Sequence, residues 1–409
     1  MVRKCAVGTV CWVVGCGAAP EPAWSDAPLQ HSAYVWQRAW SPEVRAAVAS
    51  ADGAERVVLV READAASTVW TGFWSADGQP VRNPPATWAP SGEAPAGEVA
   101  LALRWNDPTT ALQAGVVSGG VAAVLERARA MGVGVSSVHL DADIPTGRLA
   151  DWAAVVRGAA RDNNVKVAVL TLVDHVGKPG WETLTDAVDA VVVQVHSVPI
   201  ATKGGPVLLD LPTADRALRH AVATSAAPVW LALPTHTLTH ATTGAAVRAE
   251  PALVAPWVGE LIRRHPPGLA GVVWFRLPVE GDDDTWTTET WAAVRAGTVP
   301  ESTLSVVLEH PPVEWGAAPS ARAVMVAVDG PDHRWLPTLD VCVDTGRLLV
   351  APTDPRYRER PRVGDCVRLT PRTDSLLAPG GQEPVALVLA EHTPRVVVVE
   401  NPERAEALQ

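Results

Sequence analysis

Three titratable side chains share one face of a short apolar run near the middle of the chain. His139, Asp141 and Asp143 alternate with apolar residues, and Pro145 ends the run. Successive side chains of a β-strand point to opposite faces, so this spacing places the imidazole and both carboxylates on the same face. Two neighbouring carboxylates suit acid/base chemistry. Asp143 would touch a substrate. Asp141 beneath it would raise the pKa of Asp143 or relay its proton.

The same pattern has a purely structural interpretation. Burying two carboxylates two residues apart is unfavourable unless they are paired, hydrogen-bonded or partly protonated. Arg38, Arg104 or Arg276, each at the end of another apolar run, could supply the pairing. The alternative is therefore an interior ion-pair network that does no chemistry.

Short apolar runs alternate with helix-like segments from residue 32 to about residue 295. The eight runs cover residues 32–37, 55–61, 98–105, 137–143, 165–172, 190–196, 228–234 and 270–276. Apolar strands separated by helices indicate a parallel sheet covered on its outer face, and eight such units predict a (β/α)8 TIM barrel over residues 31–299. A doubly wound open sheet competes with this, but no glycine-rich phosphate loop follows the first run. Residues 62–97 are rich in Pro, Gly and Trp, and we expect an inserted loop or hairpin over one barrel mouth.

The pattern changes after about residue 300. Short β-like runs follow one another between Pro, Gly and Asp turns, with no helical periodicity. This predicts a small antiparallel β domain over residues 300–409, arranged as a sandwich. Its role, as a packing partner of the barrel or a ligand-binding module, is left open by the sequence.

Polar residues follow the predicted barrel strands, where barrel enzymes carry their chemistry. We therefore predict Asp143 and Asp141 as the catalytic pair. The predicted substrate-contacting residues are Trp36, Gln37, Arg38, Arg104, His139, Gln194, His196, His236, Trp274 and Arg276. Glycoside hydrolysis needs a second carboxylate at a defined separation, for which Glu62, Asp174 and Glu280 are candidates.

The strand-four carboxylates and Trp274 together are similar to chitinase-type barrels. In those barrels an acidic series ends strand four and a strand-eight tryptophan floors the sugar subsite. The present sequence departs from that pattern, because Pro145 stands where the family has its glutamate general acid. By this resemblance, either Asp143 is itself the acid or the barrel has lost hydrolysis.

Four motifs in order resemble a family of bacterial proteins called domain of unknown function 3142. They are "YVWQRAW" (34–40), "VHLDADIPTGRLADW" (138–152), "VVVQVHSV" (191–198) and "LALPTH" (231–236). The resemblance covers roughly residues 32 to 280 and supplies no activity. It implies that one site contains Trp36, Gln37, Arg38, Asp141, Asp143, Gln194 and His196.

A metal-dependent hydrolase is a weaker alternative. Five histidines lie near predicted strand ends, namely His139, His175, His196, His236 and His240, and with an aspartate they could bind a metal. No His-x-His follows the first strand and no His-Glu-x-x-His occurs, so we predict no metal and no cofactor. The acidic run at 282–284 is predicted to cap the helix after strand eight.

Composition sets further limits. The chain has 409 residues, 47% hydrophobic and 19% charged, which suits a globular protein larger than one hydrophobic core. A net charge of −11 without a basic patch argues against nucleic acid as a partner. Tryptophan, with 17 residues, outnumbers Phe and Tyr, with 2 each. Sugar-stacking platforms would explain this, and so would GC-rich codon bias, which we favour.

The N-terminus has the pattern of an export signal. Val2-Arg3-Lys4 forms a basic region, and Cys5 to Gly15 an apolar region too short to span a bilayer. The following Cys16 resembles the lipidated cysteine of bacterial lipoproteins, so residues 1–16 are predicted as a signal peptide and 17–30 as an Ala/Pro-rich tether. An ordinary secretory signal is the alternative. Cys342 and Cys366 form either a disulfide or two buried thiols.

These observations predict an exported lipoprotein, anchored on the periplasmic or outer-surface side of the cell envelope, whose barrel binds a polysaccharide or other glycan. Hydrolysis of glycosidic bonds by the strand-four aspartates is the further step. The alternative is a non-catalytic envelope lipoprotein that binds glycan or holds partners through the barrel mouth.

Overall fold

The computed structural model describes most of the chain beyond its first residues. The residues described are 28–36, 41–50, 54–63, 99–105, 107–130, 134–196, 200–202, 205–239, 246–311, 317–318, 320–343, 348–363, 365–372, 376–390 and 394–399. The predicted signal peptide, the tether up to residue 27 and Cys16 lie outside them. No helix in the described part of the chain is long and apolar enough to cross a membrane.

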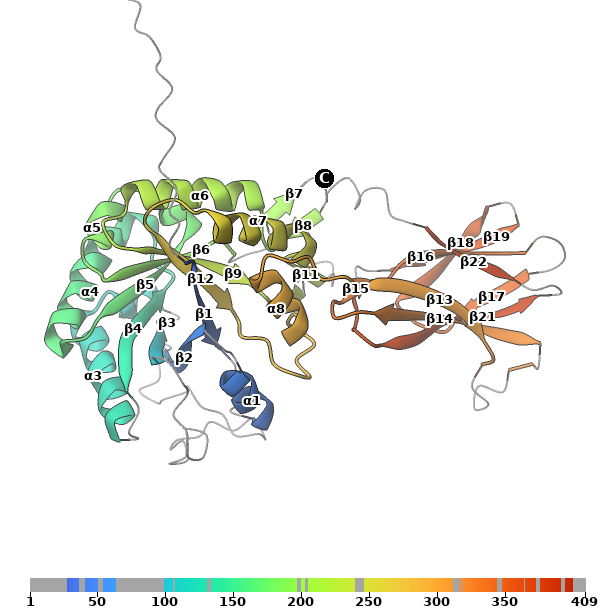
Figure 1. The fold of residues 1–409 in the computed structure, drawn as a ribbon, viewed down its shortest axis with the longest axis horizontal. Helices are drawn as coiled ribbons and strands as arrows, with labels where there is room; N and C mark the ends of the chain where they lie inside the picture. The colour runs from blue at the N-terminus through green and yellow to red at the C-terminus, as the bar shows by residue number, and fades with distance from the viewer. Residues whose placement is uncertain are drawn as a thin grey trace, which may run out of the picture.

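Eight parallel strands form the sheet of the N-terminal domain (Figure 1). They are β1 (Gln30–Val35), β2 (Ala54–Ala63), β3 (Val99–Trp105), β4 (Val135–Ala142), β5 (Val167–Leu172), β6 (Ala190–Gln194), β9 (Val229–Pro234) and β12 (Leu269–Phe275). Strand β1 pairs with both β2 and β12, so the ladder returns on itself. The predicted α/β class with a curled parallel sheet is confirmed.

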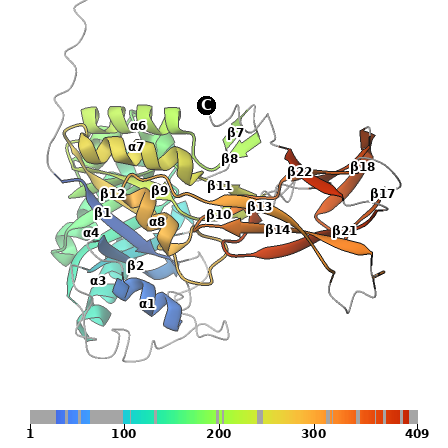
Figure 2. The ribbon, with the colours of Figure 1, turned by 45° about the vertical axis from the view of Figure 1, so that its right-hand side comes forward.

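Helices follow most of these strands and cover the outer face of the sheet (Figures 1 and 2). They are α1 (Pro42–Ser50), α2 (Pro108–Ala111), α3 (Ala114–Ala130), α4 (Leu149–Asn163), α5 (Trp181–Thr185), α6 (Leu211–Thr224), α7 (Pro251–Arg263) and α8 (Thr288–Arg295). Short 3-10 turns lie at Thr146–Arg148 and Val173–His175. The connection predicted at 62–97 lies almost wholly outside the described residues.

Local sequence explains where these helices begin. Pro42 opens α1, and the Ser41 hydroxyl accepts a hydrogen bond from the Val44 amide, as the pattern predicts. Helix α4 buries Leu149, Trp152, Val155 and Val156 against the strands, which is the predicted apolar face. The largest core of the molecule lies in this layer between strands and helices.

A second, smaller core fills the inside of the barrel. Tyr34, Ala100, Ala102, Leu170, Val192, Ala232 and Val273 form this cluster, with Trp36, Trp230 and Phe275 packed against it. Each strand thus sends alternate side chains inward and outward. This alternation decides which polar residues reach the mouth.

Two hairpins rise from the carboxyl ends of barrel strands. Strands β7 (Ile200–Thr202) and β8 (Gly205–Val207) follow β6, and β10 (Thr237–Thr239) and β11 (Ala246–Arg248) follow β9. They therefore stand on the same side of the sheet as the end of β4.

The C-terminal domain consists of antiparallel sheets, as predicted. One has the order β13 (Thr303–Glu309), β14 (Ala321–Asp329), β21 (Gln382–Ala390) and β17 (Leu348–Pro352), and the other β18 (Tyr357–Val363), β19 (Cys366–Pro371), β16 (Thr338–Cys342) and β22 (Arg395–Val399). Residues of both sheets share one hydrophobic core. A short ribbon of β15 (Arg334–Trp335) and β20 (Leu376–Leu377) lies toward the barrel (Figure 1).

A disulfide joins Cys342 on β16 to Cys366 on β19, which stand opposite each other in the ladder. Of the two alternatives in the sequence, the structure has the bonded form. The bridge closes a loop with a sequence separation of 24 residues.

Replacing both cysteines by alanine should lower the free energy of unfolding of this domain by about 3 kcal/mol, because the unfolded chain regains loop entropy. Urea unfolding of the double variant, compared with the wild type under oxidising conditions, measures the difference. A loss below about 1 kcal/mol, the low part of the usual range, would contradict the expectation.

Candidate functional site

A hydrogen bond across the barrel interior forms the floor of the site. The Tyr34 hydroxyl on β1 and Nδ1 of His139 on β4 lie 2.9 Å apart, and both side chains are buried. Burial lowers the pKa of His139 to about 4. His139 is therefore neutral at physiological pH. It lies at the bottom of the mouth.

Above this floor, one arginine joins the two strand-four carboxylates. Nη1 of Arg104 donates to Oδ2 of Asp141 at 2.6 Å, and its Nη2 donates to Oδ2 of Asp143 at 2.9 Å. The side chains differ in exposure: 3% for Asp141, 26% for Arg104 and 53% for Asp143. The trio thus runs from the buried interior to the solvent at the mouth. Arg104 is one of the three predicted pairing partners, and it pairs with both aspartates in the described part of the chain.

Asp141 sits in a strongly desolvated position. Burial raises the pKa of its carboxyl, and the charge and hydrogen bond of Arg104 oppose this shift. Gln194 on β6 lies near enough to lower the pKa as well. Asp141 Oδ1 and Gln194 Nε2 are both buried, and neither makes a well-formed hydrogen bond within the described residues. Asp141 therefore lies beside Gln194 and shares Arg104 with Asp143.

The backbone after β4 is held by a histidine from the next strand end. His175 accepts a hydrogen bond from the Leu172 amide at Nδ1 and donates from Nε2 to the Ile144 carbonyl at 2.8 Å. Its side chain is buried, which lowers its pKa. Because Ile144 directly follows Asp143, this neutral imidazole fixes the segment that presents the exposed carboxylate.

Imidazole and aromatic rings line the opposite side of the mouth. His196 donates from Nδ1 to the Ala232 carbonyl at 2.9 Å, and His236 from Nδ1 to the Phe275 carbonyl at 3.1 Å. Their ring centroids lie 5.5 Å apart, and each packs against Phe275. Trp36 lies against the same phenyl ring at 5.2 Å. Burial lowers the pKa of His196 to about 3 and also lowers that of His236, so both rings are neutral.

Trp274 does not form the floor of a sugar subsite, contrary to the expectation. Its side chain is fully buried between β12 and the helices, where its Nε1 donates to Nδ1 of His31 at 3.3 Å. Phe275, one position later, points inward instead. The structure shows which residues of β12 face inward at Gly271, which faces Trp230 so closely that a Cβ would lie 2.4 Å from the ring. Counting in twos from that glycine places Val273 and Phe275 inside.

Arg276 is also engaged elsewhere. Its Nη2 donates to both carboxylate oxygens of Asp282, at 2.8 and 2.7 Å. The acidic run 282–284 therefore does not cap helix α8 as expected, since the Thr287 hydroxyl accepts from the Thr290 amide in that role. Asp282 instead ties the end of β12 to its own loop.

Other predicted residues remain apart or outside the described positions. Gln37, Arg38, His240 and the side chain of Glu62 lie outside them. Asp174 and Glu280 are exposed and make no hydrogen bond or ion pair within the described residues, so the carboxylate that shares a partner with Asp143 is Asp141. The described part of the chain holds no group of three His, Cys, Asp or Glu side chains placed to hold a metal.

Comparison with known proteins gives a family for the middle of the chain. Residues 97–250 match the family model described as Domain of unknown function (DUF3142). The match includes β3 to β9 and hence Arg104, Asp141, Asp143, Gln194 and His196, and it confirms the resemblance over that segment. No curated protein matches the chain.

Solved glycoside hydrolase structures show a weak overall likeness to this chain. A chitinase from Chromobacterium violaceum is 16% identical with a TM-score of 0.45, over 66% of this chain and 98% of that one. A chitinase from Bacteroides thetaiotaomicron is 11% identical with a TM-score of 0.46, over 63% and 93%. A GH113 beta-1,4-mannanase is 11% identical with a TM-score of 0.40, over 66% and 98%. Likenesses this distant give no information on activity.

Proposed function

We propose that the mouth of the barrel binds carbohydrate, and that the parallel strands form a (β/α)8 barrel of the glycoside-hydrolase type. The observation that carries the proposal is the half-exposed Asp143, held by Arg104 just after β4, together with Trp36 and Phe275, which pack together at the same ends of β1 and β12. Sugars are bound by carboxylate and guanidinium groups that hydrogen-bond hydroxyls and by aromatic faces that cover the ring. The neutral imidazoles of His196 and His236 add polar groups without adding charge.

Hydrolysis of glycosidic bonds is the second candidate function. It is favoured by two carboxylates, Asp141 and Asp143, that share Arg104, of which the buried Asp141 has a raised pKa. In this scheme Asp143 contacts the scissile bond as acid/base and Asp141 acts through Arg104. Without hydrolysis, the same groups form a glycan receptor.

We further propose that the protein is exported and held at the cell envelope by a lipid on Cys16. The basic and apolar N-terminal pattern supports this, and the Cys342–Cys366 disulfide suits an oxidising compartment. Labelling cells with a radioactive fatty acid and comparing the wild type with Cys16→Ala tests the anchor. Equal labelling of the two proteins would rule it out.

Affinity electrophoresis of the purified protein through gels that each contain one envelope polysaccharide tests the binding proposal. The wild type should be retarded by at least one polysaccharide, and Asp143→Asn should weaken that binding at least tenfold. The matched control is Asp162→Asn, because Asp162 is likewise an exposed carboxylate that pairs with an arginine, Arg161, but lies at the far end of α4. It should bind as the wild type does.

The same samples separate the two functions. Release of reducing ends by the wild type but not by Asp143→Asn would support hydrolysis, whereas binding without release would support a receptor. Retardation by none of the polysaccharides, or equal retardation of the wild type and Asp143→Asn, would overturn the proposal.

A further inference from the structure

The C-terminal domain contacts the barrel on the side of its mouth. In Figures 1 and 2 the domain extends from the region of β10, β11 and α8, which follow barrel strands β9 and β12. Among the described residues, the contacts include those of Trp335 on β15 and of the turn Gly330–Pro331–Asp332–His333 between β14 and β15. We call these four residues the docking turn.

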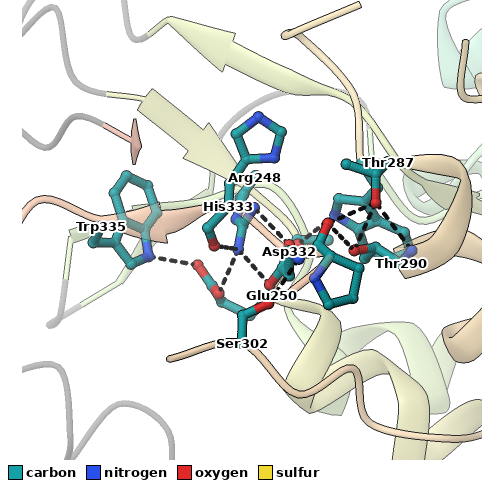
Figure 3. A network of polar contacts seen from close by, with 11 residues as sticks. Arg248, Glu250, Thr287, Thr290, Ser302, Asp332, His333 and Trp335 are labelled. Atoms are coloured by element: carbon teal, nitrogen blue, oxygen red, sulfur yellow. Dashed lines mark hydrogen bonds and ion pairs between the residues drawn. The ribbon is translucent and has the colours of Figure 1, made fainter. Parts of the chain in front are cut away.

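A buried ion pair fixes the docking turn to the hairpin that follows β9. Arg248 on β11 donates from Nη1 and Nη2 to the two oxygens of Asp332, at 3.2 and 3.0 Å, and from Nη2 to the His333 carbonyl at 3.0 Å (Figure 3). The side chains of Arg248 and Asp332 are only 2% and 9% exposed. Glu250 completes the group by accepting from Nε1 of Trp335 at 2.9 Å.

The turn is also fixed to the loop that follows β12. The hydroxyls of Thr287 and Thr290, at the start of α8, both donate to the Pro331 carbonyl, at 2.6 and 2.9 Å (Figure 3). The Asp332 amide donates to the Ser302 hydroxyl at 2.7 Å. Gly330 has φ +113, and a Cβ there would lie 2.4 Å from the Glu301 carbonyl oxygen, so only glycine lets the turn approach this closely.

From the docking turn, backbone hydrogen bonds lead directly to the mouth. The Trp286 amide donates to the Thr235 carbonyl at 2.8 Å, and the Thr237 amide donates to the Asp284 carbonyl at 2.7 Å. These bonds bracket His236, whose imidazole contacts Phe275. The loop therefore lies between the docking turn on one side and the wall of the mouth on the other.

We infer that the C-terminal domain is a positioning element for the mouth. The docking turn, locked by Arg248 and Asp332, holds the loop 276–287 against the end of β9 and so sets the places of His236 and Phe275. Asp332 and Arg248 are positioning residues that do not touch a ligand. The consequence for glycan affinity rests on the proposed function, whereas the consequence for the loop does not.

Hydrogen exchange of the full chain, read by mass spectrometry, tests the inference with Asp332→Asn. Amides of 276–287 should exchange at least tenfold faster than in the wild type, while those of α4 stay unchanged. The control is Asp340→Asn, which breaks another two-bond ion pair, to Nε and Nη2 of Arg368, within the C-terminal domain. It should leave the loop 276–287 unchanged.

A milder variant guards against misfolding. Thr290→Val removes one hydroxyl from the Pro331 carbonyl and keeps the cap at Thr287, so it should accelerate exchange of the same loop about threefold. Wild-type exchange in 276–287 of both variants, or an equal acceleration in α4, would overturn the inference.

Affinity for the polysaccharide that retards the wild type should fall at least fivefold in Asp332→Asn. Unchanged affinity together with faster loop exchange would also overturn the positioning role. If no polysaccharide retards the wild type, the proposed function fails while the exchange result still decides whether the domain holds the loop.

Discussion

Replacing Arg104 by methionine should lower the free energy of unfolding by about 3 kcal/mol at pH 7, because it leaves Asp141 as a buried carboxylate without its cation. Asp141 is 3% exposed and its pKa is already raised by burial. The variant should also lose most of its glycan affinity, since Asp143 loses the group that holds it. Thermal and urea unfolding measure the first effect, and affinity electrophoresis the second.

A double-mutant cycle with Asp141→Asn shows whether the pairing itself is responsible. Removing both charges should be less destabilising than removing Arg104 alone, because no uncompensated ion remains. Arg161→Met provides the control, since Arg161 forms an exposed pair with Asp162 and should change stability by no more than about 0.5 kcal/mol. Equal effects of Arg104→Met and Arg161→Met would show that the Arg104 contacts do not hold the site together.

Acid should destabilise the barrel through its buried histidines. His139 has a pKa of about 4 in the fold, against an ordinary value of 6.5, so below pH 6.5 the unfolded chain binds a proton that the folded chain does not. Its contribution to stability is fully present above pH 6.5 and is lost as the pH falls toward 4. Between pH 7 and pH 5 this amounts to about 2 kcal/mol for His139 alone.

Comparison with His139→Gln isolates this term from the buried aspartates. Asp141, whose pKa is raised, works in the opposite direction, gaining stability as the pH falls. Glutamine can still accept a hydrogen bond from Tyr34 but does not titrate. The wild type should therefore lose about 2 kcal/mol more than His139→Gln between pH 7 and pH 5 in urea unfolding. Parallel pH profiles would mean that His139 is protonated as easily in the folded state as in the unfolded chain.

Local patterns were sufficient to predict much of the fold. Apolar runs located the eight parallel strands, and in the structure His139 contacts Tyr34 across the sheet while Asp141 and Asp143 share Arg104. The cap at Ser41 and the apolar face of α4 follow from short-range rules in the same way. The antiparallel character of the C-terminal domain was also readable, because its turns recur at short intervals.

The features that sequence reasoning missed depend on long-range contacts, or on which alternate residues of one strand face inward. Trp274 and Phe275 are neighbours in a strand of apolar residues, and either could face inward until the packing of Gly271 on Trp230 is known. Arg276 pairs with Asp282 within its loop, and the hydrophobic periodicity of the sequence does not predict this ion pair. The pair of Arg248 and Asp332 joins residues 84 positions apart in different domains, and so could not be read from spacing.

A crystal structure of the full chain with an oligosaccharide from the polysaccharide that retards it tests the central claim most directly. We predict a sugar ring against Trp36 and Phe275, with a hydroxyl within hydrogen-bonding distance, about 2.5–3.2 Å, of a carboxylate oxygen of Asp143. An oligosaccharide bound elsewhere, with the mouth of the barrel free of sugar, would contradict it.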